Sequence, residues 1–81
     1  MYKKVYVEVV GRFDLEGDIH PEKIIWEDTR EFEIDRVIEK VKRASMKAGG
    51  IGIRYTVRIG NKTKHLYFED GGKWFVEQYY A

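Results

Sequence analysis

Hydrophobic and polar residues alternate along much of this chain, with the period of a β-strand that buries one face. Val5, Val7 and Val9 lie on one face of a first predicted strand. Gly11 follows in the same run, and a glycine inside a strand pattern indicates a bulge or a tight bend. The chain therefore predicts a β-rich fold from its first residues onward.

Two shorter β-prone runs follow a polar stretch. Residues 14–21 are mostly polar and predict a connecting loop. The runs 23–27 and 31–34 flank Asp28 and Thr29, which predicts a hairpin. A glycine at position 29 would suit a tight primed turn better than threonine does, because such turns need a positive φ.

The clearest unit is a hairpin over residues 51–69. Gly60 and Asn61 form a two-residue turn signal, which sets Ile59 opposite Lys62. One face, which we take as the core, then holds Ile53, Tyr55, Val57, Leu66 and Phe68. The other face holds Arg54, Thr56, Arg58, Thr63, His65 and Tyr67.

The last predicted strand, 73–79, has two possible registers. A three-residue loop sets Glu69 opposite Lys73 and buries Trp74, whereas a two-residue loop turns every side chain over and buries Phe75. We favour the first register because it pairs two opposite charges and buries the indole. Phe75 then lies on the outer face of the sheet.

Residues 35–48 are ambiguous between a helix and a strand. Asp35 could cap a helix that ends at Gly49. Its apolar stripe would hold Val37, Ile38, Val41, Ala44 and Ala48. The alternative continues a strand from Phe32 through a bulge to Val41, followed by a loop. The pattern alone favours the helix.

A resemblance bears on this choice. The segment WEDTREFEIDRVIEKVKRASMKAGGIGIRYTVRI and the terminal KWFVE resemble a family of short uncharacterised proteins of clostridial-type bacteria, whose function is not known. The similarity covers most of the chain from Val5 onward and is most specific over 47–59. It implies that relatives hold a proline in place of Arg43 and a glycine in place of Thr29, and this chain departs from both. The resemblance therefore favours strand over helix and assigns no functional residue.

Taken together, these patterns predict one domain over residues 1–81 with a mainly β fold. We expect a small, strongly bent antiparallel sheet or an SH3-like barrel of five to six strands, with at most one short helix. The alternative is an α+β fold, in which one helix near 35–48 packs on a curved antiparallel sheet. A chain of 81 residues buries a thin core in either case.

Charge is divided unevenly although the net charge is only +1. Residues 1–35 and 66–81 are acidic, while 36–65 hold nine basic residues against Glu39 alone. Such asymmetry can mark an interaction surface, or the two signs can lie side by side and neutralise each other. The chain lacks cysteine, and no apolar run is long enough for a membrane span or a signal peptide, so we expect a cytoplasmic protein.

No residue pattern predicts catalysis. His20 and His65 are too few for a zinc site, and Ser45 lacks the surroundings of a nucleophile. We therefore expect no enzyme, no cofactor and no metal. Lys47, Gly49 and Gly50 form a candidate anion-contact loop, although a strand rather than a helix follows these glycines.

The outer face of the 51–79 sheet is the candidate partner surface, because it combines basic and aromatic side chains. The candidate surface comprises Arg54, Arg58, His65, Tyr67 and Phe75 on that face, together with Lys62 and Lys64 from the same hairpin. We expect a non-catalytic binding module for protein–protein interaction or self-association as a homo-oligomeric adaptor. The alternative is nucleic-acid binding, with cations on phosphates and rings on bases. The sequence leaves open whether the acidic half covers this face.

Overall fold

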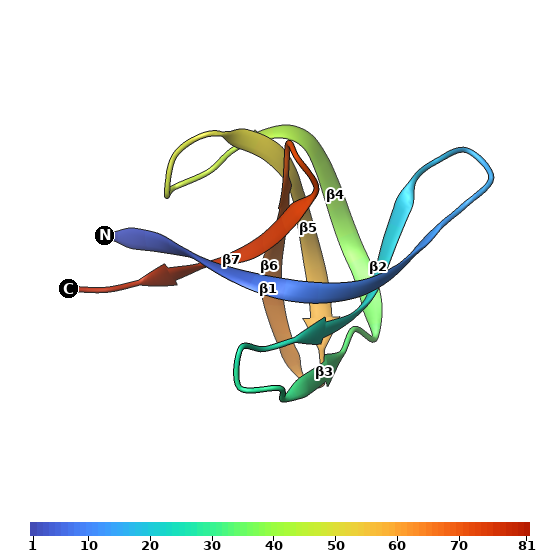
Figure 1. Ribbon diagram of the computed structural model, residues 1–81, viewed down its shortest axis with the longest axis horizontal. Helices are drawn as coiled ribbons and strands as arrows, with labels where there is room; N and C mark the ends of the chain where they lie inside the picture. Colours follow the sequence, from blue (N-terminus) through green and yellow to red (C-terminus); the bar gives the residue numbers. More distant parts are fainter.

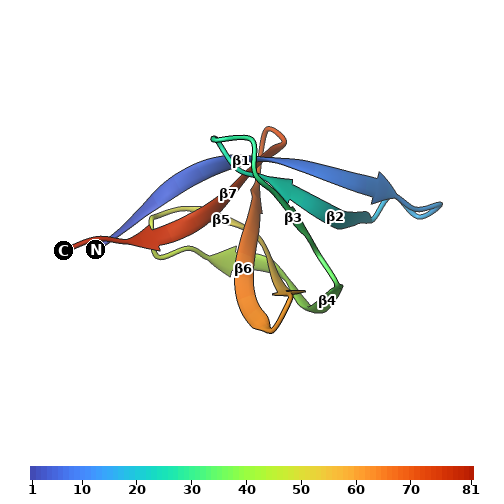
Figure 2. The same ribbon diagram turned by 90° about the horizontal axis from the view of Figure 1, so that it is seen from below.

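The computed structural model describes residues 1–81 as one antiparallel sheet of seven strands without a helix (Figure 1). The strands are β1 (Tyr2–Phe13), β2 (Ile19–Ile25), β3 (Glu31–Glu33), β4 (Arg36–Ser45), β5 (Ile51–Ile59), β6 (Lys62–Glu69) and β7 (Lys73–Tyr79). Their order in the sheet is β3-β2-β1-β7-β6-β5-β4. The sheet curls into a half-barrel (Figure 2). The mainly β prediction is confirmed, with more strands than the five to six expected, and the α+β alternative is wrong.

The β5–β6 hairpin has the predicted register. Ile59 lies opposite Lys62, and Tyr55 lies opposite Leu66. Gly60 begins the two-residue turn with a φ of 62°. A positive φ at the first turn position matches the right-handed twist of the flanking strands and is readily adopted by glycine.

The three-residue loop between β6 and β7 is confirmed as well. Phe68 lies opposite Trp74, and Glu69 lies opposite Lys73. The ion pair of Glu69 is nevertheless made with a different strand, because its carboxylate contacts Lys4 Nζ of β1 at 3.0 Å. The register is thus right, although the expected charge pair is not what Glu69 forms.

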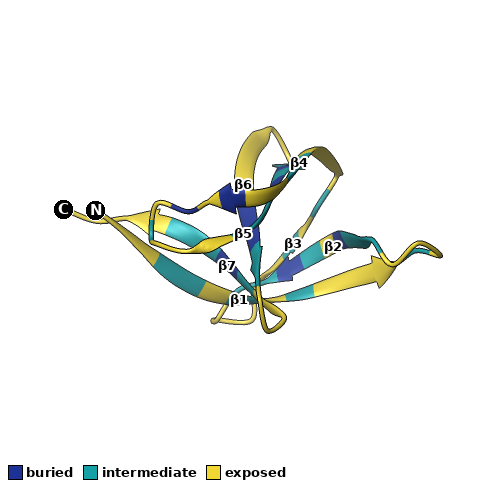
Figure 3. Cartoon of the chain, turned by 90° about the horizontal axis from the view of Figure 1, so that it is seen from above, coloured by how far each residue is buried: buried dark blue, intermediate teal, exposed yellow.

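The core lies on the concave face of the half-barrel, where the alternation placed it. Ile24, Tyr55, Val57 and Leu66 are buried there. The partly buried residues around them are Val7, Val9, Phe32, Ile34, Ile53, Ile59, Phe68, Trp74 and Val76. Figure 3 shows that burial is concentrated in the middle of the strands, while the outer ends stay exposed. The predicted core face of β5 and β6 is therefore correct.

The segment predicted as a helix by its apolar stripe is strand β4, so that interpretation is wrong. The register against β5 shifts twice, between Val37 and Glu39 and between Val41 and Ala44. Each bulge adds a residue and breaks the two-residue alternation, so the apolar spacing resembles that of a helix. Arg43, within the second bulge, has a φ of 56°.

The loop expected over 14–21 is shorter than predicted. Strand β2 begins at Ile19, and Pro21 is buried within it, opposite Gly11. The register between β1 and β2 shifts at Gly11, which confirms the predicted bulge. Proline is tolerated here because a bulge interrupts the ladder of hydrogen bonds.

Contacts beyond the strand ladders support the curled shape of the half-barrel: those of Asp35 extend the β4–β5 pair, and one of Tyr55 joins β5 to β2. Asp35 joins β3 to β4, and its amide donates to Arg58 O at 2.8 Å. Its Oδ2 accepts the Gly60 amide at 2.8 Å, which fixes the β5–β6 turn. Tyr55 Oη donates to Ile19 O of β2 at 3.2 Å. No helix in the fold could cross a lipid bilayer.

Candidate functional site

Strands β6 and β7 separate soon after the turn that joins them. They pair only over residues 67–69 and 73–75. Beyond that point, residues 62–66 of β6 pair with β5 on one side alone, and residues 76–79 of β7 pair with β1 on one side alone. The sheet therefore contains two inner strand edges without a neighbouring strand.

The register indicates which backbone groups face this opening. The hydrogen-bonded pairs of the hairpin begin at Ile59 and Lys62, next to the two-residue turn. Hydrogen bonding alternates along an antiparallel strand, so Thr63 and His65 direct their N–H and C=O groups away from β5. The same alternation directs those of Glu77 toward β6. Such groups are an available template for another strand.

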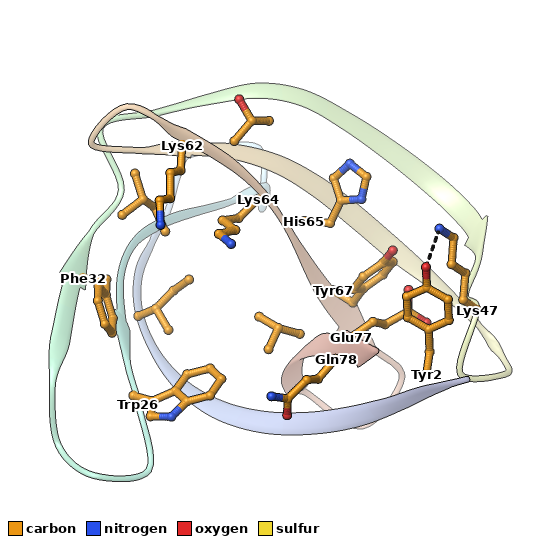
Figure 4. A pocket seen from close by; sticks show the side chains of 14 residues that line it. Tyr2, Trp26, Phe32, Lys47, Lys62, Lys64, His65, Tyr67, Glu77 and Gln78 are labelled. Carbon is orange, nitrogen blue, oxygen red and sulfur yellow. Dashed lines mark hydrogen bonds between the residues drawn. The ribbon is translucent and has the colours of Figure 1, made fainter. Parts of the chain in front are cut away.

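A cavity of 540 Å³ occupies the opening, and we call it the β6–β7 groove (Figure 4). Ile24, Ile59 and Val76 contribute its apolar lining from three different strands. Trp26 and Phe32 form one wall, where the β2–β3 hairpin curls toward β6. The groove is an extension of the concave core that this sheet leaves unfilled.

Three lysines line the groove. Lys62 and Lys64 extend from β6 into the cavity (Figure 4). Lys47 comes from the β4–β5 loop and lies over the ring of Tyr2, 4.7 Å from its centroid. None of the three amino groups lies within 4.0 Å of a carboxylate oxygen, so their charge is available to a ligand.

Glu77 is the single acidic residue of the groove lining. Its Oε2 accepts a hydrogen bond from the Ala48 amide, which holds the β4–β5 loop against β7. Burial raises the pKa of the neighbouring Tyr67 to about 12, and the Glu77 carboxylate adds to this rise. The three lysines outnumber this one carboxylate, so the groove is positively charged overall.

The division of charge along the sequence persists in the folded protein. Most acidic residues of 1–35 that form ion pairs do so within that segment, such as Glu31 with Lys23 at 2.9 Å. Of the basic residues in 36–65, Lys40 pairs with Asp18 and Arg54 with Glu39. The others form no ion pair, so the acidic half does not neutralise the basic segment.

The predicted basic and aromatic face is divided by the fold. Arg54, Arg58 and His65 share it, but Tyr67 and Phe75 are buried there together with Met46 of the β4–β5 loop. Their rings are stacked, 5.1 Å apart. This face is therefore a second small core rather than a platform of exposed rings. Lys62 and Lys64, which alternate with His65 along β6, lie in the groove instead.

His65 is exposed at the edge of the groove. Partial burial of its ring lowers its pKa, and the charges of Arg54 and Lys47 lower it further. The imidazole is therefore neutral near pH 7, and it adds hydrogen-bonding capacity to this edge rather than charge.

Amides of the candidate anion-contact loop already donate hydrogen bonds to other groups of this chain. Gly49 and Gly50 have φ values of 100° and 94°, the left-handed turn that glycine permits. The Gly49 amide donates to Met46 O at 3.1 Å, and the Ala48 amide is bound to Glu77. Lys47 is the part of this loop that faces the groove.

Sequence reasoning missed the groove wall of Trp26, Phe32 and Tyr2. Their alternation marks them as strand residues, but nothing local reveals that β6 and β7 separate. Comparison of the chain with protein-family models, curated proteins and solved structures finds no match.

Proposed function

We propose that this chain is a non-catalytic protein-interaction module that binds an extended polypeptide segment in the β6–β7 groove. The supporting observation is the pair of unpartnered strand edges, 62–66 and 76–79, on the two sides of one cavity. An added strand satisfies such edges with main-chain hydrogen bonds, and neighbouring pockets then select side chains.

The lining of the groove favours a segment that carries acidic and apolar residues on the same face. The side chains of a bound strand alternate between two faces. One of these faces would meet the apolar lining of Ile24, Ile59 and Val76. A carboxylate on the same face would lie within reach of Lys62 and Lys64, because these lysines lie opposite Ile59 and Val57 and share their face. Electrostatic complementarity of this kind contributes to specificity and to the rate of association.

The test is calorimetric titration with a peptide of about seven residues that places valine, glutamate and phenylalanine on one face of the extended strand. We expect binding to the intact chain. The double variant Lys62→Glu and Lys64→Glu should weaken it by about tenfold or more, because it sets like charges against each other.

Matched controls separate the groove from net charge. Arg36 and Lys42 are exposed cations without ion pairs outside the groove, so Arg36→Glu with Lys42→Glu makes the same change in charge. This variant should keep most of the binding. A peptide with lysine in place of glutamate should not bind. Equal losses in both double variants, or binding of both peptides, would refute the proposal.

The proposal includes an SH3-like use of the fold, in which a small bent sheet presents a groove and no catalytic group, and it assigns the protein to the cytoplasm. The SH3-like use of the fold is supported by the arrangement of the groove, in which a filled core lies beside an open cleft lined by lysines and aromatic rings.

Nucleic acid is the second candidate ligand, favoured by the basic side chains of 36–65 that form no ion pair. Binding through phosphates would weaken steeply with salt, because it releases counterions. Titration of labelled single-stranded RNA at rising salt concentration distinguishes the two candidates. Burial of Tyr67 and Phe75 removes the stacking rings that this candidate requires, so the polypeptide is the better-supported ligand.

A further inference from the structure

An apolar arm projects from the half-barrel. Beyond the Gly11 bulge, β1 and β2 continue as a hairpin that extends away from the rest of the sheet (Figures 1 and 2). We call residues 10–19 of this hairpin the arm. Its hydrophobic side chains are unusually open: Val10 is 45% exposed, Phe13 70% and Leu15 107%. Several such residues gathered on one projection indicate a contact with another molecule.

The tip of the arm has a defined conformation. Asp14 Oδ1 accepts the amides of Glu16 at 2.9 Å and Asp18 at 3.0 Å. Its Oδ2 lies 2.8 Å from His20 Nε2. These bonds fix the loop with Leu15 directed outward. A hydrophobic side chain held in the solvent by an ordered turn is already arranged for binding, which lowers the entropic cost of association.

We propose that the arm docks in the β6–β7 groove of a second copy of this chain, so that two copies form a reciprocal dimer. This inference rests on the proposed function of the groove as a polypeptide-binding site. The arm combines Phe13 and Leu15 with three carboxylates within 4.8 Å of one another, those of Asp14, Glu16 and Asp18. The groove combines apolar walls with Lys47, Lys62 and Lys64.

The size and the charge of the two surfaces correspond. A cavity of 540 Å³ is within the range that holds a few large side chains. The lysines of the groove have no carboxylate of their own chain within 4.0 Å, and Glu16 at the tip of the arm has no cation. Docking would bring these groups together and cover Phe13 and Leu15.

The arm does not reach the groove of its own chain. Pairing with β2 through residue 19 holds it in the direction that leads away from β6 and β7 (Figure 1). A second copy supplies both missing parts, because each copy carries one arm and one groove. When each arm enters the other copy's groove, the contact is the same on both sides and the assembly closes as a dimer.

Sedimentation velocity over a range of about 1 µM to 1 mM tests the dimer. We expect the mass to rise from 9.6 kDa toward twice that value. Leu15→Lys should remain a monomer over the whole range, because it removes the apolar side chain and sets a cation against the lysines, and so should Lys62→Glu with Lys64→Glu. Two matched controls should dimerise as the intact chain does: Ile51→Lys, at an exposed residue outside the arm and the groove, and Arg36→Glu with Lys42→Glu.

Mixing the two monomeric variants gives a sharper test. One variant has an intact groove and the other an intact arm, so the mixture restores one of the two contacts and should associate weakly. Dimers that persist in both variants, or no association in the mixture, would overturn the inference. A chain that stays monomeric but binds the glutamate-containing peptide would also overturn it and leave the proposed function standing. If the chain neither dimerises nor binds the glutamate-containing peptide, both the dimer and the proposed function of the groove are refuted.

Discussion

At the scale of single residues, Thr29 shows the cost of an unsuitable turn residue. It has a φ of 71° at the end of the loop from β2 to β3. The Thr29 amide donates to Trp26 O, and the Trp26 amide donates to Arg30 O, both at 2.8 Å. This is a type I turn followed by a left-handed residue, where a β-branched side chain is strained. The sequence analysis identified position 29 as one where glycine would suit the turn better than threonine does.

Replacing Thr29 with glycine should therefore stabilise the protein. The gain in the free energy of unfolding should be about 1 kcal/mol, because relief of strain exceeds the added freedom of the unfolded chain. Urea denaturation followed by fluorescence measures the change. Thr29→Ala is the control and should gain less, because its Cβ keeps the strain. An equal gain in both variants would contradict a left-handed residue 29.

Asp14 makes the turn at the tip of the arm dependent on pH. The hydrogen bond with His20, followed by those from the Asp18 and Glu16 amides, lowers the pKa of its carboxyl from 3.8 to about 2. A lowered pKa stabilises the folded turn above pH 3.8, and this contribution is lost as the pH falls toward 2.

A carboxyl titration by NMR tests this dependence. The midpoint for Asp14 should lie near 2 in the intact chain and should move upward in His20→Ala. Since the turn presents Leu15, the arm should also loosen at the acid end of the titration. A midpoint near 3.8 in the intact chain would mean that the contact with His20 does not form in solution.

At the scale of the strand, Gly52 shows how β5 supports the second small core. A Cβ at this position would lie 2.6 Å from Phe68 O and would also meet Met46 Cε. The backbone of β6 cannot move aside as the end of a flexible side chain can. The small residue in the GGIG segment therefore allows Met46 to cover Tyr67 and Phe75.

Substitution of Gly52 by alanine should destabilise the protein by about 1–3 kcal/mol, the usual cost of overpacking. Chemical denaturation measures it, and near-ultraviolet circular dichroism reports the stacked rings. Gly11→Ala is a milder comparison, because its nearest contact is His20 O at 3.2 Å. No loss of stability in Gly52→Ala would indicate that the β4–β5 loop does not pack on this face.

The elements differ in how far the sequence determines them. The β5–β6 hairpin was predictable because Gly60 and the alternation around it are local signals. Strand β4 was not, because its bulges at Val37 and Val41 produce a helix-like spacing. Burial of Tyr67 and Phe75 depends on Met46, more than 20 residues away, so no local pattern could reveal it. The groove depends on where β6 and β7 part, which follows from the curl of the whole sheet.

At the scale of the whole molecule, the unpaired strand edges can pair with unrelated chains as well as with a specific ligand. The short acidic β3 and the bulged β4 blunt the two outer edges of the half-barrel, as is common in natural sheets. The inner edges at residues 62–66 and 76–79 have no such protection. A strand or an arm that occupies the groove would complete the sheet and neutralise its lysines.

The most direct test of this account is amide hydrogen exchange, measured by NMR with and without the glutamate-containing peptide. In the free chain at low concentration, the amides of Thr63, His65 and Glu77 should exchange quickly, while those of Lys64 and Leu66 are protected by β5. Added peptide should slow the three fast amides and leave the outer edge of β4 unchanged. Amides already protected in the free chain, or protection of β4 by the peptide with the groove unaffected, would contradict binding at the two inner strand edges.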